Sequence, residues 1–157
     1  MTMKRCLVVA GLAALITVFF PAFSKVVWGS DSITITVSYQ QRDFKRWMFE
    51  RDSCRNGEVT LELVDVLSPE GNTVDWVTFS RRAEAMGASL GLCYAEELLR
   101  VQSRIPPAWR AYDIFFPGTE MWDAHNEKRV PYLSWKKEGG YWMMDYDWVM
   151  RFPLEQN

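Results

Sequence analysis

The sequence has little charge imbalance and no dominant residue type. Its 157 residues carry 18 Lys and Arg against 20 Asp and Glu, which gives a formal net charge of −2. A nucleic-acid-binding domain usually has a strong basic excess, so we expect no nucleic acid among its partners. The hydrophobic content of 48% excludes intrinsic disorder, and the even composition excludes collagen-like and low-complexity chains.

The sequence also lacks the common catalytic motifs. It has no Walker loop, dinucleotide-binding glycine motif, Gly-x-Ser-x-Gly elbow, His-Glu-x-x-His pair or Cys-x-x-Cys pair. His125 is the only histidine, and with Asp123 it supplies two ligands at most, which is too few for a zinc site. We therefore expect no metal and no cofactor, and we favour a protein that is not an enzyme.

The N-terminus has the order of a secretory signal peptide. Lys4 and Arg5 precede an uncharged apolar run of 15 residues, and an Ala-Phe-Ser triplet then places small residues at the −3 and −1 positions of a cleavage site. We predict that residues 1–24 are removed on export and lie outside the fold. The alternative is an uncleaved anchor at residues 6–23, at the short end for spanning a membrane.

Removal of the leader leaves one exported domain, residues 25–157, in the periplasm or outside the cell. It would touch the membrane only through an uncleaved N-terminal segment. The domain retains Cys54 and Cys93, and an even count in an oxidising compartment predicts one disulfide. A bond closing a loop of about 40 residues would stabilise the fold by about 4 kcal/mol. Two unpaired, buried thiols are the alternative.

Hydrophobic patterns along this domain predict an α+β fold, with short antiparallel strands packed on one or two central helices. A stripe of apolar residues from Ala83 to Ile105, capped by Ser80, predicts either one long helix or a helix ending near Gly87 and a second over 93–104. Residues 41–55 allow a short amphipathic helix with a solvated, charged face. The predicted strands are 32–39, 58–67, 73–79, 112–116, 130–135 and 141–152, with hairpin connections at 68–72 and 136–140.

Two segments of the tail carry a resemblance to a known pattern. Residues 116–119 (FPGT) and 130–135 (VPYLSW), with 105–109 (IPPAW) before them, resemble uncharacterised bacterial proteins over roughly residues 58–152. That resemblance implies no function. More distantly, two helices followed by Trp-rich short strands resemble the C-type-lectin-like fold, which formylglycine-generating-enzyme-like proteins share.

The lectin-like resemblance implies loops that bind sugars or proteins. The sequence departs from that pattern, because the calcium-binding triplets Glu-Pro-Asn and Gln-Pro-Asp are absent. Two cysteines also cannot form the two lectin disulfides, and the closely spaced pair of the formylglycine enzymes is missing. We therefore expect neither calcium-dependent sugar binding nor copper oxidase chemistry.

Aromatic residues are concentrated in the C-terminal third. Residues 109–152 hold 12 aromatics in 44 positions, against eight in the 84 positions of residues 25–108. An excess of Trp and Tyr is typical of binding surfaces. We expect one or two of four tryptophans to be exposed in a groove: Trp122, Trp135, Trp142 and Trp148.

Acidic residues of the tail are the other candidates for chemistry. Asp145 and Asp147 fall on one face of a strand, where paired carboxylates can hold calcium or serve a glycosidase. The competing interpretation is a solvated strand face. His125, in a polar loop beside Asp123, is read as an exposed loop histidine in preference to a general base.

These observations lead to one hypothesis and two alternatives. We expect an exported, non-enzymatic binding module that recognises a protein or glycan of the cell envelope through Trp-rich C-terminal loops. The first alternative is an envelope hydrolase using Asp145, Asp147 or His125, and the second is an assembly subunit anchored by its N-terminal segment. The expected ligand-binding residues are Trp122, Asp123, His125, Trp142, Asp145 and Asp147.

Overall fold

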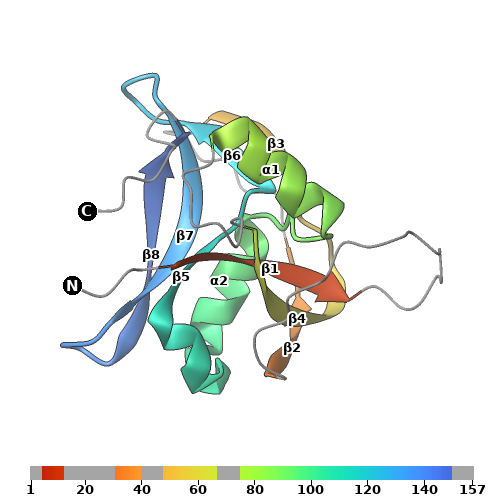
Figure 1. Cartoon of the computed structure of the whole chain (residues 1–157), viewed down its shortest axis with the longest axis vertical. Coiled ribbons are helices and arrows are strands. Elements are labelled where there is room, and N and C mark those ends of the chain that lie inside the picture. Colours follow the sequence, from red (N-terminus) through yellow and green to blue (C-terminus); the bar gives the residue numbers. More distant parts are fainter. Residues whose placement is uncertain (1–4, 13–30, 40–47, 67–74, 150–157) are drawn as a thin grey trace.

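The computed structural model describes residues 5–12, 31–39, 48–66 and 75–149 (Figure 1). These residues form a single compact α+β domain, as the sequence predicts. The helices are α1 (Trp76–Ala85), α2 (Leu92–Arg100) and the short 3-10 helices η1 (Gln102–Arg104) and η2 (Pro107–Ala111). The strands are β1 (Arg5–Leu12), β2 (Ser32–Val37), β3 (Met48–Asp52), β4 (Gly57–Asp65), β5 (Tyr112–Phe115), β6 (Thr119–Trp122), β7 (Lys128–Lys136) and β8 (Tyr141–Trp148).

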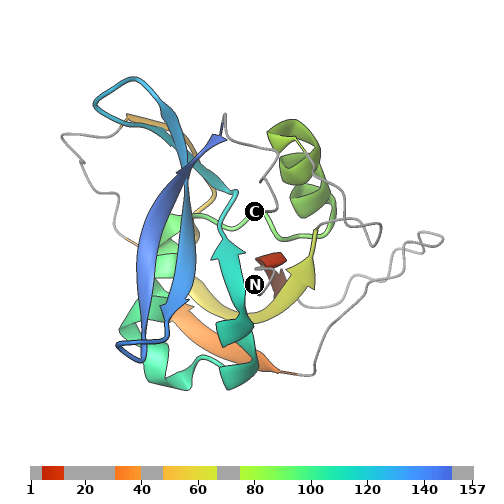
Figure 2. The ribbon, with the colours of Figure 1, turned by 60° about the vertical axis from the view of Figure 1, so that its left-hand side comes forward.

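The strands form one sheet in the order β2-β4-β1-β5-β7-β6-β3, with β8 paired to β7. Strands β5 and β6 pair with different parts of β7, Ile114 opposite Leu133 and Met121 opposite Arg129. They therefore act as two halves of one strand, interrupted at residues 116–118. Strand β8 lies along the other edge of β7, and the two form the long hairpin of Figure 2.

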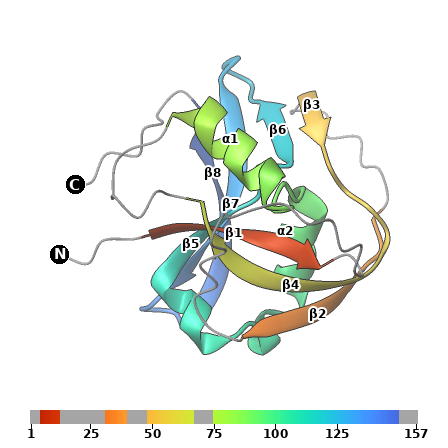
Figure 3. The same cartoon turned by 45° about the vertical axis from the view of Figure 1, so that its right-hand side comes forward.

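Each face of the sheet carries its own apolar layer, because successive residues of a strand point to opposite faces. Leu63 and Ile114 belong to one buried cluster, which includes Leu98 of α2. Their neighbours Val64 and Phe115 belong to a second cluster, which includes residues of α1. The two helices thus cover opposite faces of the sheet (Figures 1 and 3).

Helix α1 begins earlier than the sequence predicts. The Asp75 carboxylate caps it by accepting a hydrogen bond from the Thr78 N–H at 2.8 Å. The predicted strand over 73–79 and the predicted cap at Ser80 are therefore wrong. The cap and the burial of the first turns outweigh the β-propensity of a Trp-Val-Thr-Phe segment.

The helical section is divided in two. Helix α1 ends at Ala85, and Gly87 follows with a φ of 67°, a left-handed conformation that glycine adopts without strain. Helix α2 begins at Leu92. Of the two arrangements left open by the sequence, the split one is correct.

Three strands were not predicted from the sequence: β1, β3 and β6. Strand β6 lies in the segment between the predicted strands 112–116 and 130–135, which was interpreted as a loop. Strand β3 occupies part of the segment interpreted as an amphipathic helix, and residues 40–47 of that segment lie outside the described residues. Strand β3 pairs with β6, Met48 opposite Trp122. This pairing spans more than 70 positions of sequence, so local periodicity carries no information about it.

Strand β1 comes from the segment predicted to be a signal peptide. Its backbone lies between β4 and β5, with Leu7 paired to both Asp65 and Ile114 (Figure 3). The sequence analysis placed residues 5–12 outside the fold, so the structure differs there. A continuous apolar run satisfies both patterns, since a buried central strand and a signal peptide share it. Removal of residues 1–24 stays a prediction, and residues 13–30 lie outside the described part.

Within the described residues, no helix is both long enough and apolar enough to cross a bilayer.

Candidate recognition site at the β6–β7 hairpin

The break between β5 and β6 anchors the following hairpin to the start of α2. The Gly118 N–H donates to the Leu90 carbonyl at 2.9 Å, and the Gly118 carbonyl accepts from the Ser53 N–H at 2.8 Å. A Cβ at this position would lie 2.4 Å from the Ser89 carbonyl oxygen. The close approach of two backbones explains why glycine stands in the FPGT segment.

Thr119 completes this junction by capping α2 from outside the helix. The N-cap of α2 is Gly91, which has no side chain to cap the helix. The Thr119 hydroxyl accepts a hydrogen bond from the Leu92 N–H at 2.7 Å and donates to Asp52 Oδ1 at 2.6 Å. Because Thr119 is fully buried, loss of either hydrogen bond of its hydroxyl would destabilise the fold.

The disulfide predicted from the sequence is present. Cys54 and Cys93 are bonded, with Cα atoms 5.8 Å apart and a sequence separation of 39. The bond ties the segment between β3 and β4 to the first turn of α2. We use the name α2 junction for this disulfide together with Gly118 and Thr119.

The turn of the β6–β7 hairpin is organised by Asp123. Its Oδ1 accepts hydrogen bonds from the N–H groups of His125, at 2.9 Å, and Glu127, at 3.0 Å. Asn126 has a φ of 60°, a left-handed conformation that asparagine tolerates. Asp123, predicted to bind a ligand, therefore has a structural role in the turn.

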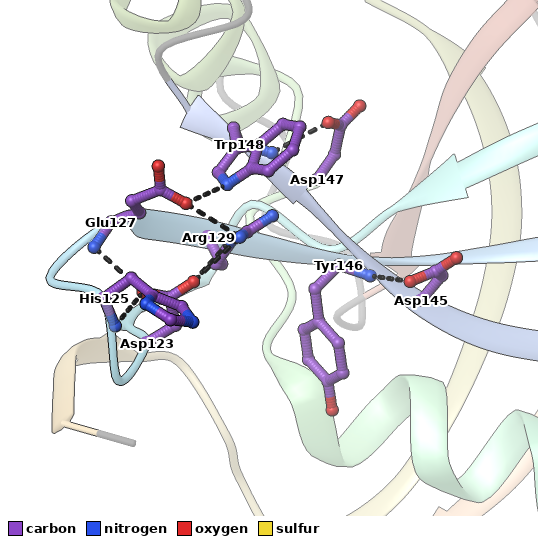
Figure 4. A network of polar contacts seen from close by, with 8 residues as sticks. All are labelled: Asp123, His125, Glu127, Arg129, Asp145, Tyr146, Asp147 and Trp148. Carbon is purple, nitrogen blue, oxygen red and sulfur yellow. Dashed lines mark hydrogen bonds and ion pairs between the residues drawn. The ribbon is translucent and has the colours of Figure 1, made fainter. Parts of the chain in front are cut away.

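On one face of the hairpin, Arg129 links the turn to Trp148 (Figure 4). Its Nε donates to Asp123 Oδ2 at 2.9 Å, and its Nη2 donates to Glu127 Oε2 at 2.9 Å. Its guanidinium lies 4.1 Å from the centre of the Trp148 ring, which is cation–π geometry. The indole N–H of Trp148 donates to Glu127 Oε2 at 2.5 Å, so both the ring face and the ring edge are held.

The opposite face repeats this arrangement around Trp122. Its indole N–H donates to Glu50 Oε2 at 3.0 Å, and the Lys128 ammonium lies 5.2 Å from the ring centre. Lys128 also pairs with Glu50 at 2.8 Å and with Glu120 at 3.3 Å. Trp122 is paired with Lys128 and Trp148 on β8 with Arg129, and Lys128 and Arg129 are consecutive in β7, so the two tryptophans lie on opposite faces of the sheet.

These contacts favour the charged forms of Glu50, Lys128 and Asp123. The hydrogen bond from Lys128 holds the pKa of Glu50 below its ordinary value, and Glu50 in turn raises the pKa of Lys128. Partial burial works to raise the pKa of Asp123, but the N–H of Glu127 and the guanidinium of Arg129 outweigh it and lower that pKa. The surface is therefore a mixed array of fixed charges around two indoles.

We define the hairpin surface by seven residues that share this network or the exposed turn. They are Trp122, Asp123, His125, Glu127, Lys128, Arg129 and Trp148.

Trp142 does not belong to a binding surface. It is 3% exposed, lies in the α2-side cluster and packs edge-on against Trp135 at 5.6 Å. The prediction that it binds a ligand is therefore not retained. The three other candidate tryptophans are partly exposed. A hollow of about 120 Å³ lies away from them, lined by Tyr39 and by Glu96 and Arg100 of α2.

Asp145 and Asp147 lie on the same face of β8, as predicted, and both face the side of the sheet occupied by α1. Each carboxylate accepts a hydrogen bond at 2.8 Å from the N–H of the next residue, Tyr146 or Trp148. Tyr146 pairs with Pro131, whose carbonyl accepts from the Phe116 N–H at 3.0 Å on the side away from β8, so the Tyr146 N–H faces the open edge. The two carboxylates thus protect an exposed edge strand.

The same face gathers negative charge around Tyr132. Burial first, and then the charges of Asp145, Asp113 and Asp147, raise the pKa of the Tyr132 hydroxyl, which is hydrogen-bonded to Asp145. Within the described residues, no group of three or more His, Cys, Asp or Glu side chains could hold a metal ion.

His125 lies on the exposed tip of the hairpin. In Figure 4 its side chain lies beside Asp123, apart from the carboxylates of Asp145 and Asp147 on β8. The three residues named for the hydrolase alternative are thus not brought together. That alternative stays a prediction without a common site.

Sequence reasoning missed the cations that hold the two indoles. Arg129 and Lys128 stand at the start of β7. Counting outward from the predicted connection at 136–140 places Arg129 opposite Asp147, whereas the structure extends β7 to Lys136 and pairs Arg129 with Trp148. The sequence therefore predicts the hairpin but not the register that brings Arg129 to Trp148.

Comparisons with family models, with curated proteins and with solved structures found no match to this chain. The resemblances noted in the sequence stay untested.

Proposed function

We propose that this protein is an exported binding module, without catalytic activity, that recognises a protein or glycan of the cell envelope through the hairpin surface. The observation that supports it most is the parallel treatment of Trp122 and Trp148. Each ring is partly exposed, carries a cation against its face and donates its N–H to a glutamate. Two independent networks that fix exposed indoles are more than folding requires.

The physical argument is one of preorganisation. Trp and Arg are the residues that most often dominate binding energies at interfaces. A side chain that is already immobile loses little conformational entropy when a partner arrives. The α2 junction holds the base of the hairpin, and Asp123 holds its tip, so the whole surface is presented as a rigid unit.

Export is supported by the predicted leader and by the disulfide, since such bonds persist in oxidising compartments. Both the leader and the disulfide are features of this chain itself and are not carried over from a related protein.

The test uses protein recovered from cells that export the chain. Wild type, Trp122→Ala, Trp148→Ala and Tyr141→Ala would be titrated against envelope extract and a glycan panel. Tyr141 is the matched control, because it is an exposed aromatic (46%) at the opposite end of β8. Each tryptophan variant should bind about 30-fold more weakly, as loss of an interface hot spot implies.

Tyr141→Ala should bind like wild type. Saturable binding that survives both tryptophan substitutions would place the site elsewhere. If neither the envelope extract nor the glycan panel contains a ligand that binds saturably, the proposal is overturned.

A further inference from the structure

Strand β1 occupies the middle of the sheet, although it lies in the segment predicted to be removed on export. Its backbone pairs with β4 from Leu7 to Leu12 and with β5 from Arg5 to Val8. Its loss would leave a slot between β4 and β5, which lie about 10 Å apart, or two inter-strand spacings. The facing N–H and C=O groups along 60–65 and 112–115 would then lack partners.

The walls of this slot do not depend on β1 alone for their position. Leu61 of β4 and Ile35 of β2 lie in the same buried cluster as Leu98 of α2 and Leu133 of β7. The disulfide also fixes the segment that leads into β4 to helix α2. Both sides of the slot are therefore attached to α2, and this attachment opposes closure of a gap between them.

The chemistry of the walls specifies what would fill the gap. Leu63 and Val64 of β4 face opposite apolar layers, and so do Ile114 and Phe115 of β5. A strand covered on both faces is apolar along its whole length. The occupant must also run antiparallel to β4 and parallel to β5, as β1 does. The pair formed by β1 and β5 is the only parallel pair in the described part of the chain.

One end of the slot is acidic. In the register of β1, Arg5 stands opposite Tyr112, next to Asp113. The negative charges of Asp113, Asp145 and Asp147 all act on Tyr132 of the adjacent strand. A basic residue at the N-terminal end of the occupant complements this charge.

We propose that, once residues 1–24 are removed, the slot between β4 and β5 binds an extended apolar strand from a partner protein, with a basic residue at its N-terminal end. The partner's strand takes the register of β1 and forms backbone hydrogen bonds on both sides, a known mode of peptide recognition. This inference rests on the export included in the proposed function. It adds a second contact surface and names the chemistry of the partner.

The test begins with the full chain, so that β1 is in place when the protein folds. A protease site inserted after Ser24 is cut once the protein is folded and oxidised. A fluorescent peptide of residues 4–12, with Cys6→Ser, is then added in excess, and exchange is followed by anisotropy and intact mass. Hydrogen exchange reports the amides of β4 and β5.

We expect one peptide to bind per protein. Loss of the cut leader should expose the amides of residues 60–65 and 112–115, and the peptide should restore their protection. A Val8→Pro peptide removes a backbone donor in the part that pairs with both walls and should bind about tenfold more weakly or worse. A peptide of reversed sequence should also bind weakly, because the slot has polarity.

Any one of the following results would overturn the proposal. The cut leader could resist displacement by excess peptide, or the β4 and β5 amides could stay protected with no strand bound. The exported protein could also retain its full-length mass in cells. If the cut chain unfolds as the leader leaves, the peptide must restore the native near-ultraviolet circular dichroism, and failure to do so counts against the slot as well.

The hairpin surface is tested separately by the same preparation. Trp122→Ala and Trp148→Ala should exchange the peptide like wild type, since neither residue lines the slot. If the two tryptophan variants exchange the peptide normally and still bind envelope extract like wild type, only the hairpin surface is rejected. If they fail to exchange the peptide but lose envelope binding, only the slot is rejected.

Discussion

The two ends of strand β6 use polar side chains in different ways. At its start, the Thr119 hydroxyl is fully buried and bonded to a helix N-terminus and to Asp52. At its end, Trp122 and Asp123 are partly exposed within networks of charged groups. Polar groups in the α2 junction have no access to a ligand and serve folding, whereas those in the hairpin surface can meet one. Substitutions at the two ends should therefore separate stability from binding.

The largest effect is expected from the disulfide. Replacing Cys54→Ala and Cys93→Ala together should lower the free energy of unfolding by about 4 kcal/mol, because the unfolded chain regains the freedom of a 39-residue separation. Urea denaturation of oxidised wild type and of the double variant measures this. A loss below about 1 kcal/mol would show that the α2 junction holds without its covalent bond.

Gly118→Ala should come next. Its new Cβ would meet the backbone of Ser89 and Leu90, which cannot turn aside as a side chain can, and about 3 kcal/mol of stability should be lost. Gly139→Ala is the matched control, because there the added Cβ meets only the exposed ring of Tyr141. Equal urea midpoints for the two variants would contradict the close approach.

Thr119→Val should cost about 2 kcal/mol, since it keeps the shape of the residue but leaves the Leu92 N–H and the Asp52 carboxylate without their buried partner. Thr119→Ser retains the hydroxyl and should recover most of this loss. Thermal and urea unfolding of the two variants would measure this difference. A loss in Thr119→Ser as large as that in Thr119→Val would show that the methyl group matters as much as the hydroxyl.

The smallest effect is expected at the hairpin turn, as a pH dependence. The fold lowers the pKa of Asp123, so its stabilising contribution is complete above a pH of about 4 and is lost as the pH falls through the lower, folded value. Amide resonances of His125 and Glu127 should shift in that acid range. In Asp123→Asn this acid transition should be absent. Its persistence there would assign it to another carboxylate.

Local patterns in the sequence predict several elements correctly. Strand β2 follows from strict alternation of buried and exposed residues, and the β7–β8 hairpin follows from the turn residues at 136–140. The disulfide follows from the number of cysteines and the expected compartment. Each of these inferences needs only neighbouring residues or a count.

Features that depend on distant contacts could not be predicted in this way. Trp142 and Trp148 occupy equivalent positions on one face of β8, so alternation treats them alike. Trp142 is buried in the cluster that includes α2, whereas Trp148 meets the Arg129 guanidinium and stays partly exposed. The distinction lies in what covers each end of the strand. Strand β3 was missed for the same reason, because its partner β6 is distant in sequence.

The most direct test of the hairpin surface is photo-crosslinking inside cells that export the protein. His125, at the exposed tip, would be replaced with a photoreactive phenylalanine analogue, and Tyr141 likewise at the far end of β8. We predict a discrete crosslinked species from position 125 that disappears when Trp148→Ala is added, and none from position 141. A crosslink from position 141 alone, or from neither position, would contradict the account.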